Sequence, residues 1–238
     1  MDKPPYEVIQ IDEKSWRICE KGVMSFLFVG AEKALLIDSG FGTGNIKEVV
    51  ESLTKLPIML VTTHADRDHV GGNKQFDKAY MHPAEFHRYR THTAVEREFP
   101  AEPLWENDII DLGGRCFKVV LIPGHTPGNI VLLDAENRIL TGSDSIQAEK
   151  EIWMFGPGRD MDAYIHSMKK LRDMRDCFSA VYPSHGPFPV DPGVIDDLIT
   201  GAELLRDGKI EGGPPPGDAP PQAAQSKLYA YGRVKFLY

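Results

Sequence analysis

Four potential metal ligands fall within the six-residue segment 64–69, which reads HADRDH. The segment follows an apolar run and precedes two glycines, so we expect a loop at the end of a buried strand. Alternate residues of an extended chain point the same way, so His64, Asp66 and Asp68 can converge while His69 turns toward a second point. Mixed imidazole and carboxylate donors suit zinc, iron or manganese better than calcium. Taken alone, the segment has an alternative interpretation as a polar loop with solvated charges.

Further potential ligands stand at the ends of other apolar runs. His125 lies in Gly-His-Thr-Pro-Gly, Asp144 in Gly-Ser-Asp-Ser and His185 in Ser-His-Gly. Each follows β-branched or apolar residues and precedes turn-forming ones, which is the pattern of a ligand carried at the C-terminal end of a strand. Asp38 ends an upstream apolar run in the same way.

This ordered set of motifs resembles the metallo-β-lactamase superfamily. The dinuclear site of that family is built from His-x-His-x-Asp-His, a Gly-His-Thr-x-Gly loop, a bridging Asp and a last His. The resemblance extends from about residue 20 to about residue 190. It implies an α/β fold of the four-layer αββα sandwich type, with two β-sheets flanked by helices.

The resemblance also implies a dinuclear centre with two divalent metal ions as cofactors. The expected ligands are His64, Asp66 and His125 for the first metal, Asp68, His69 and His185 for the second, and Asp144 as the bridge. The resemblance implies an additional catalytic role for Asp68, which is to accept a hydrogen bond from the bridging hydroxide and orient it. Asp38 is expected behind the ligands, where it fixes the tautomer of a ligand histidine.

Two positions depart from the family pattern. Asp66 stands where the family usually has His, and it makes the first site a harder donor set. Zinc is therefore the first expectation, with iron or manganese as alternatives. Asp is one methylene shorter than the Glu of the superfamily's diiron flavoproteins. An alternative is therefore that the Asp66 carboxylate does not reach the first metal, which would weaken metal binding at that site. Ser143 stands where the family normally has Gly before the bridging Asp.

The implied chemistry is hydrolysis. Two metals that share a solvent molecule lower its pKa from ~15.7 toward neutrality and polarise a carbonyl or phosphoryl oxygen. Resemblance to the glyoxalase-II-like and lactonase-like branches favours a small ester, thioester or lactone as substrate. The alternatives are a diiron redox protein that reduces oxygen or nitric oxide with an external electron donor, and a degenerate metal-binding protein without activity.

Composition and charge restrict the classes of binding partner and the cellular location that we expect. The 238 residues carry a net charge of −8 and no dense basic run, so we expect no nucleic-acid partner. No apolar run approaches the ~18 residues of a membrane span, and residues 1–5 do not open a signal peptide, so the expected location is the cytoplasm. With only three cysteines we expect no structural disulfide, and we expect Cys116 and Cys177 to pack in the core. A small-molecule substrate is expected, with a homodimer as an alternative to a monomer.

Hydrophobic patterning predicts the elements that position these residues. We expect strands at 7–11, 15–20, 24–29 and 34–37, hairpins at 104–122 and 129–141, and helices at 45–56, 162–174 and 196–207. Residues 76–103 are expected to be helix and loop with exposed histidines, and 146–159 to be irregular. A single domain is expected over residues 1–211, followed by a Pro- and Gly-rich linker over 212–225. Residues 226–238 alternate enough to form a docked strand or a subunit contact.

Overall fold

The computed structural model describes residues 5–92, 100–217, 219 and 221–238. The chain divides into two compact units, Met1–Val120 and Leu121–Tyr238. Residues 1–4, part of the segment that we expect not to open a signal peptide, lie outside the described residues. The same holds for residues 93–99 of the stretch expected to be helix and loop. Within the described ranges, no helix has the length and apolar character needed to cross a membrane. The single domain over 1–211 and the linker over 212–225 stay predictions.

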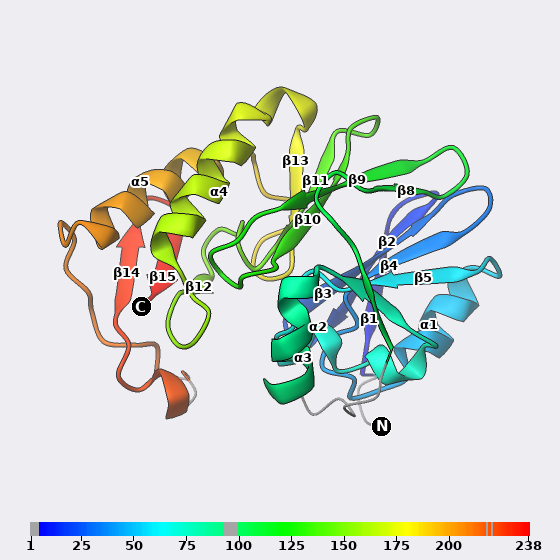
Figure 1. Ribbon diagram of the computed structural model, residues 1–238, viewed down its shortest axis with the longest axis horizontal. Coiled ribbons are helices and arrows are strands. Elements are labelled where there is room, and N and C mark those ends of the chain that lie inside the picture. The colour runs from blue at the N-terminus through cyan, green and yellow to red at the C-terminus, as the bar shows by residue number, and fades with distance from the viewer. Residues whose placement is uncertain (1–4, 93–99, 218, 220) are drawn as a thin grey trace. The chain divides into compact units, whose positions relative to one another are not determined.

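The first unit is built on a seven-stranded sheet in the order β1-β2-β3-β4-β5-β6-β7 (Figure 1). Its strands are β1 Glu7–Asp12, β2 Ser15–Glu20, β3 Val23–Val29, β4 Ala34–Ile37, β5 Ile58–Val61, β6 Ala79–Met81 and β7 Ala101–Pro103. The pairs from β1 to β4 are antiparallel, and those from β4 to β7 are parallel. β8 (Ile109–Asp111) and β9 (Cys116–Leu121) pair as an antiparallel hairpin that is not part of the seven-stranded sheet.

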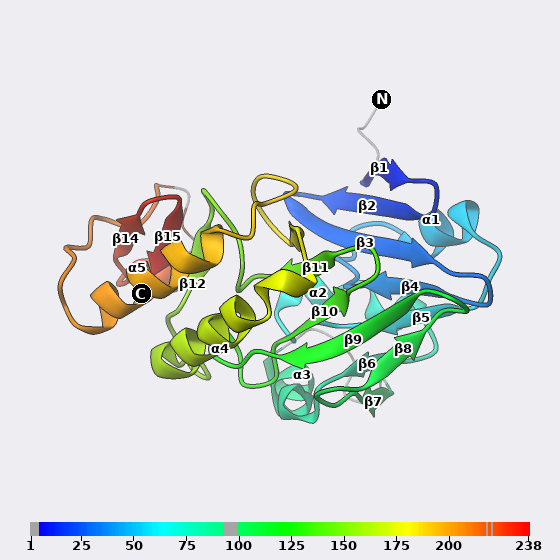
Figure 2. The ribbon, with the colours of Figure 1, turned by 90° about the horizontal axis from the view of Figure 1, so that it is seen from above.

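Helices α1 (Ile46–Leu53), α2 (Arg67–Val70) and α3 (Phe86–His92) lie on one face of this sheet (Figures 1 and 2). Short 3-10 turns, η1 (Asn73–Gln75) and η2 (Pro83–Glu85), precede β6 and α3. The Asn45 side chain caps α1 by accepting a hydrogen bond from the Glu48 amide at 3.2 Å. Ile46 and Val50 of this helix are fully buried and belong to the hydrophobic core formed with the sheet.

Parallel pairing of β4 with β5 determines where the first predicted ligands lie. Ile37 is opposite Val61 in the register, and each is the last residue of its strand. Asp38 and the segment that begins at Thr62 therefore leave the sheet at the same C-terminal edge. In open α/β sheets this edge is where ligands bind.

The second unit contains β10 (Ile130–Asp134), β11 (Ile139–Ser143) and β13 (Ala180–Pro183). β10 and β11 are antiparallel, and β11 and β13 are parallel with Ser143 opposite Pro183. Helices α4 (Met161–Asp173) and α5 (Val194–Arg206) run side by side (Figure 2). The Asp160 side chain caps α4 through the Ala163 amide at 2.9 Å. Turns η3 (Arg175–Cys177) and η4 (Pro221–Ala223) complete the described helical segments.

A three-stranded sheet in the order β12-β15-β14 was not expected. It joins β12 (Glu151–Trp153) to the two strands of the chain end, β14 (Leu228–Tyr231) and β15 (Val234–Leu237). β12 lies inside the stretch expected to be irregular, because its partner is more than eighty positions away and local sequence does not reveal such a pairing. β14 and β15 form an antiparallel hairpin where one strand was expected.

Two other expectations are wrong in detail. Cys116 and Cys177 are exposed and do not pack in the core. Cys116 begins β9, where alternate residues face outward, and Cys177 ends the 3-10 turn after α4. The stretch 76–103 contains the short strands β6 and β7 in addition to helix.

Candidate metal centre

The segment 64–69 leaves β5 and enters the single turn of α2. His64 and His69 are both completely buried, and their rings lie 4.0 Å apart between centroids. Asp66 and Asp68 are partly exposed, with 16% and 22% of their side-chain surfaces accessible. Arg67 between them is exposed, as expected of a residue that cannot itself bind a metal. The loop thus presents two buried imidazoles and two carboxylates together.

Asp38 supports this loop from the end of the neighbouring strand. One of its oxygens accepts a hydrogen bond from the Thr63 amide at 2.7 Å. The other accepts from the Thr63 hydroxyl and from Nδ1 of His69, both at 2.8 Å. A carboxylate at Nδ1 requires the proton on that nitrogen, so Nε2 of His69 is the nitrogen with its lone pair available.

The carboxylates of the loop face the Nε2 atoms of its histidines. Asp66 Oδ2 lies 3.7 Å from His64 Nε2, and Asp68 Oδ2 lies 3.7 Å from His69 Nε2. His64 Nδ1 is 3.0 Å from the Thr63 hydroxyl, so the other face of that ring is engaged by the protein. Both histidines therefore present Nε2 toward a carboxylate oxygen.

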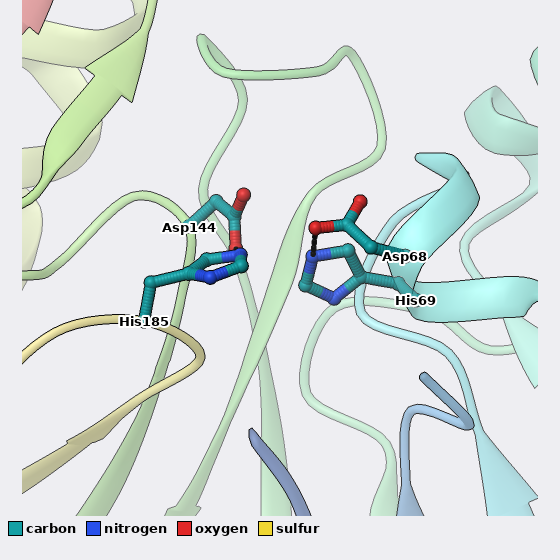
Figure 3. A group of neighbouring side chains, drawn as sticks. All are labelled: Asp68, His69, Asp144 and His185. Atoms are coloured by element: carbon teal, nitrogen blue, oxygen red, sulfur yellow. Dashed lines mark ion pairs between the residues drawn. The ribbon is translucent and has the colours of Figure 1, made fainter. Parts of the chain in front are cut away.

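The second unit carries its own cluster of donors. Asp144 follows β11 and His185 follows β13 by two residues, so the parallel pairing of these strands brings them together. Asp144 Oδ1 lies 3.4 Å from His185 Nε2, and Asp144 Oδ2 lies 3.8 Å from His125 Nε2. His125 Nδ1 is 3.0 Å from the backbone oxygen of Trp153. Figure 3 shows the pair Asp144 and His185, and separately the pair Asp68 and His69, with each imidazole close to its carboxylate.

The spacing of these atoms fits ligands that share a metal ion. Distances of 3.4–3.8 Å from Nε2 to oxygen are long for hydrogen bonds. Two ligand atoms bound tetrahedrally to one zinc at about 2.0–2.2 Å lie roughly 3.4 Å from each other. Buried imidazoles whose Nδ1 is held by the protein are also typical of metal ligands. These imidazole and carboxylate pairs therefore have the chemistry and spacing of donors that share a divalent metal ion.

Glycines allow the backbone to approach closely behind these loops. A Cβ on Gly71 would lie 2.2 Å from the Phe41 oxygen, so only glycine fits between α2 and the loop after β4. A Cβ on Gly124 would lie 2.4 Å from the Tyr164 Cα, and this residue precedes His125. Both glycines fix the position of a loop that carries predicted ligands.

Ser143, the second departure from the family motif, has a φ of 50°. This left-handed conformation favours glycine, which is the residue the family normally has there. The Ser143 hydroxyl is buried and accepts a hydrogen bond from Asn129 at 2.9 Å. Asn129 also accepts from the Ser145 hydroxyl, so a polar network on both sides holds Asp144 in place.

Sequence reasoning missed the residues of η2 and α3 that contact the ligand loop. Arg88 donates from Nε and Nη2 to Asp66 Oδ1, at 2.8 and 2.5 Å. Glu85 is completely buried and accepts a hydrogen bond from the Ala65 amide at 2.9 Å. Their spacing of three residues indicates a shared helical face but does not indicate a contact with the ligand loop. Of the histidines in this stretch, His87 is exposed, His82 caps η2 through the Ala84 amide, and the side chain of His92 lies outside the described residues.

Comparison with known proteins agrees with the motifs. The family model of the metallo-beta-lactamase superfamily matches residues 20–185. Acyl-coenzyme A thioesterase MBLAC2 from Gallus gallus is 28% identical over 198 residues, which cover 67% of this chain and 71% of that protein. Hydroxyacylglutathione hydrolase from Gloeobacter violaceus is 28% identical over 154 residues, 63% of this chain and 59% of that protein.

The fold likeness is broader than the sequence likeness. A metallo-beta-lactamase from Pontibacter korlensis has a TM-score of 0.69 at 20% identity, covering 83% of this chain and 99% of that chain. The expected α/β fold of the metallo-β-lactamase type is therefore confirmed.

Proposed function

Because this chain belongs to the metallo-beta-lactamase superfamily, we propose that it is a metal-dependent hydrolase that cleaves small thioesters. One observation carries the proposal: Asp144 presents its two oxygens to two different histidines, at 3.4 and 3.8 Å, as a carboxylate between two metal ions would. Among the ester-type substrates expected from the sequence, thioesters are favoured because the relatives include an acyl-coenzyme A thioesterase. Small esters and lactones belong to the same reaction class and are the next candidates.

The ligand assignment that we propose is the one that the family motifs imply. His64, Asp66 and His125 would hold one ion, Asp68, His69 and His185 would hold the other, and Asp144 would contact both. When bound, the two ions supply Lewis acidity and lower the pKa of a bound water toward neutrality. We expect zinc, with iron or manganese as the alternatives because of Asp66.

The chain's own groups then have separate tasks. Asp38 and the Trp153 carbonyl orient His69 and His125 through their Nδ1 atoms, at 2.8 and 3.0 Å. Asp68 has one oxygen at 3.7 Å from His69 Nε2 and remains partly exposed, so it can accept a hydrogen bond from water at the site. Such a bond directs a water lone pair toward the thioester carbonyl carbon. A carbon–oxygen bond then forms, the carbon–sulfur bond breaks with its electron pair leaving on the thiolate, and the proton of the water passes to solvent.

The redox alternative has one specific observation in its favour, the carboxylate at position 66. It predicts bound iron, near-ultraviolet absorption bands and consumption of oxygen or nitric oxide with an electron donor. The degenerate alternative predicts one metal or none. Metal content and an absorption spectrum of the purified protein therefore separate the three functions.

The test combines metal analysis with a substrate panel. The panel contains an acyl-coenzyme A, a glutathione thioester, a lactone, a phosphodiester and a β-lactam. We expect about two divalent ions per chain, a colourless solution and fastest hydrolysis of a thioester. Chelation should abolish that activity, and added zinc should restore it. Thioester hydrolysis that survives complete chelation, or a metal-replete protein inactive on all five compounds, would contradict the proposal.

A further inference from the structure

The side chain of Asp66 is held by a neighbouring helix. Asp66 occupies the position before α2, yet its side chain does not cap that helix. Two nitrogens of the Arg88 guanidinium donate to one oxygen, Oδ1, at 2.8 and 2.5 Å. The other oxygen, Oδ2, lies toward His64 Nε2 at 3.7 Å. The carboxylate is thus oriented with one oxygen toward Arg88 and the other toward the imidazole.

Arg88 belongs to a helical face that makes two hydrogen-bonding contacts with the ligand loop and one with η1. Glu85 accepts from the Ala65 amide at 2.9 Å, Arg88 bonds to Asp66, and the Tyr89 hydroxyl accepts from Asn73 at 3.2 Å. Residues at i, i+3 and i+4 share one face of a helix. Arg88 and Asp66 are also shielded, with 22% and 16% of their side chains exposed. This burial distinguishes the pair from an ordinary surface ion pair, which contributes little.

The contact between Arg88 and Asp66 compensates for two consequences of having aspartate at position 66, its charge and its freedom to rotate. A carboxylate adds a negative charge where the family has a neutral imidazole, and the guanidinium offsets that charge. Aspartate is also short, and a freely rotating carboxylate could bind through either oxygen. Two donors on Oδ1 leave Oδ2 as the oxygen directed toward His64 Nε2.

We propose that Arg88 is a positioning residue for the first metal ion: it holds Asp66 as a one-oxygen ligand and makes the Asp66–Arg88 pair an electrostatic equivalent of the usual histidine. This inference rests on the proposed function, because it requires that His64 and Asp66 bind a metal. Residues that orient ligands in this way contribute about 10- to 100-fold to metal affinity.

The experiment measures zinc affinity by chelator competition and does not depend on turnover. Arg88→Met removes the donors and keeps the length of the side chain, and Arg88→Lys keeps the charge without the paired donors. Arg90→Met is the matched control, because Arg90 is an exposed arginine of the same helix that lies over the Phe86 ring. We expect Arg88→Met to weaken one of two zinc sites by about 10- to 100-fold, Arg88→Lys to weaken it less, and Arg90→Met to leave both unchanged.

A double variant separates positioning of Asp66 from general support of the loop. With histidine at position 66 the Asp66 carboxylate is no longer there for the guanidinium to orient, so Asp66→His/Arg88→Met should bind zinc at least as tightly as Asp66→His. A loss on removing Arg88 that is equal in both backgrounds would assign Arg88 to fold support and overturn the inference. Unchanged zinc affinities in Arg88→Met would overturn it as well.

The wild-type protein distinguishes this inference from the proposed function. If it binds no zinc, iron or manganese, the proposed metal centre fails and the inference fails with it. If it binds two ions and the Arg88 variants behave as wild type, only the inference fails. Should Arg88→Met fail to fold, as judged by circular dichroism of the metal-free protein, Arg88→Lys and Asp66→His/Arg88→Lys supply the same comparison.

Discussion

Single side chains at strand ends carry the proposed chemistry, and the structure pairs each imidazole with a carboxylate. His64 with Asp66, His69 with Asp68, and His185 with Asp144 each have an Nε2-to-oxygen distance of 3.4–3.7 Å. A bound metal cation would offset the negative charge of these carboxylates. Metal binding is therefore expected to stabilise the fold as well as to support catalysis.

Replacing Asp144 tests its proposed role as the carboxylate between two metal ions. Asp144→Ala removes the carboxylate proposed to contact both metals, so hydrolysis should fall by at least about 100-fold while the fold stays intact. Steady-state kinetics, metal analysis and circular dichroism measure the three quantities. Asp162→Ala is the control, because Asp162 lies on α4 of the same unit with 78% of its side chain exposed. A variant that keeps more than about a tenth of wild-type activity would exclude Asp144 as a metal ligand.

Elements with a clear local pattern were predictable from the sequence. The strands from β1 to β4, the hairpin of β10 and β11, and helices α4 and α5 lie within a few residues of their expected ranges. The apolar runs of β3, β4, β10 and β11 are buried almost throughout, and α4 and α5 bury the side that carries their periodic apolar residues. β12 could not be predicted, because three residues gain strand geometry only from a parallel partner, β15, near the chain end.

Among the site residues, those within local sequence motifs could be predicted and those that depend on tertiary contacts could not. Motifs indicate His64, His69 and His125 because turn residues and apolar runs surround them in sequence. The role of Arg88 depends on α3 approaching a loop twenty-two positions earlier, and charge alone does not reveal which arginine does so. The buried Glu85 was missed for the same reason.

Helix α3 is joined to the loop after α2 through Tyr89, and this contact should be sensitive to alkali. Burial raises the pKa of Tyr89 from 10.0 to about 12, so the folded protein favours the neutral phenol. The resulting stabilisation is complete below pH 10 and is lost as the pH rises through about 12. Ionisation against that shift costs on the order of 2–3 kcal/mol, and Tyr89→Phe does not incur it.

Urea unfolding at pH 8 and near pH 12 tests this expectation. At pH 8 Tyr89→Phe should lower the free energy of unfolding by about 1 kcal/mol, because it removes the hydrogen bond from Asn73. Near pH 12 the difference from wild type should vanish or reverse. Tyr6, whose pKa burial also raises to about 12, is present in both proteins and cancels in the comparison. A constant difference at both pH values would mean that the Tyr89 hydroxyl is not shielded in solution.

Each of the two units carries donor residues at the ends of parallel strands. β4 and β5 place Asp38 and His64 in the first unit, and β11 and β13 place Asp144 and His185 in the second. The net charge of −8 includes the carboxylates of these clusters, so bound cations would offset part of it. The expectations of a small-molecule substrate, no nucleic-acid partner, a cytoplasmic location and a homodimer as the alternative oligomer stay predictions.

The chain end contributes to the core of the second unit. β15 pairs in parallel with β12 and antiparallel with β14, and Val234, Phe236 and Leu237 are buried. The Phe236 ring contacts Tyr164 of α4 edge-on, with 5.8 Å between centroids. A Cβ on Gly201 of α5 would lie 3.1 Å from the same ring. Phe236 therefore fills the space between two helices and the small sheet.

Truncation of Phe236 should destabilise the protein, and truncation of the last residue should not. Phe236→Ala leaves a cavity among buried groups and should cost about 3–5 kcal/mol of unfolding free energy. Tyr238→Ala should change it by less than about 0.5 kcal/mol, because 51% of Tyr238 is exposed and its backbone bonds to Lys227 remain. Deleting residues 227–238 should lower the melting temperature at least as much as Phe236→Ala, since it removes two of the three strands. Thermal melts, with the mass in solution measured alongside, check all three variants. If the truncated protein melts with wild type at the same mass, the chain end does not pack as the structure shows.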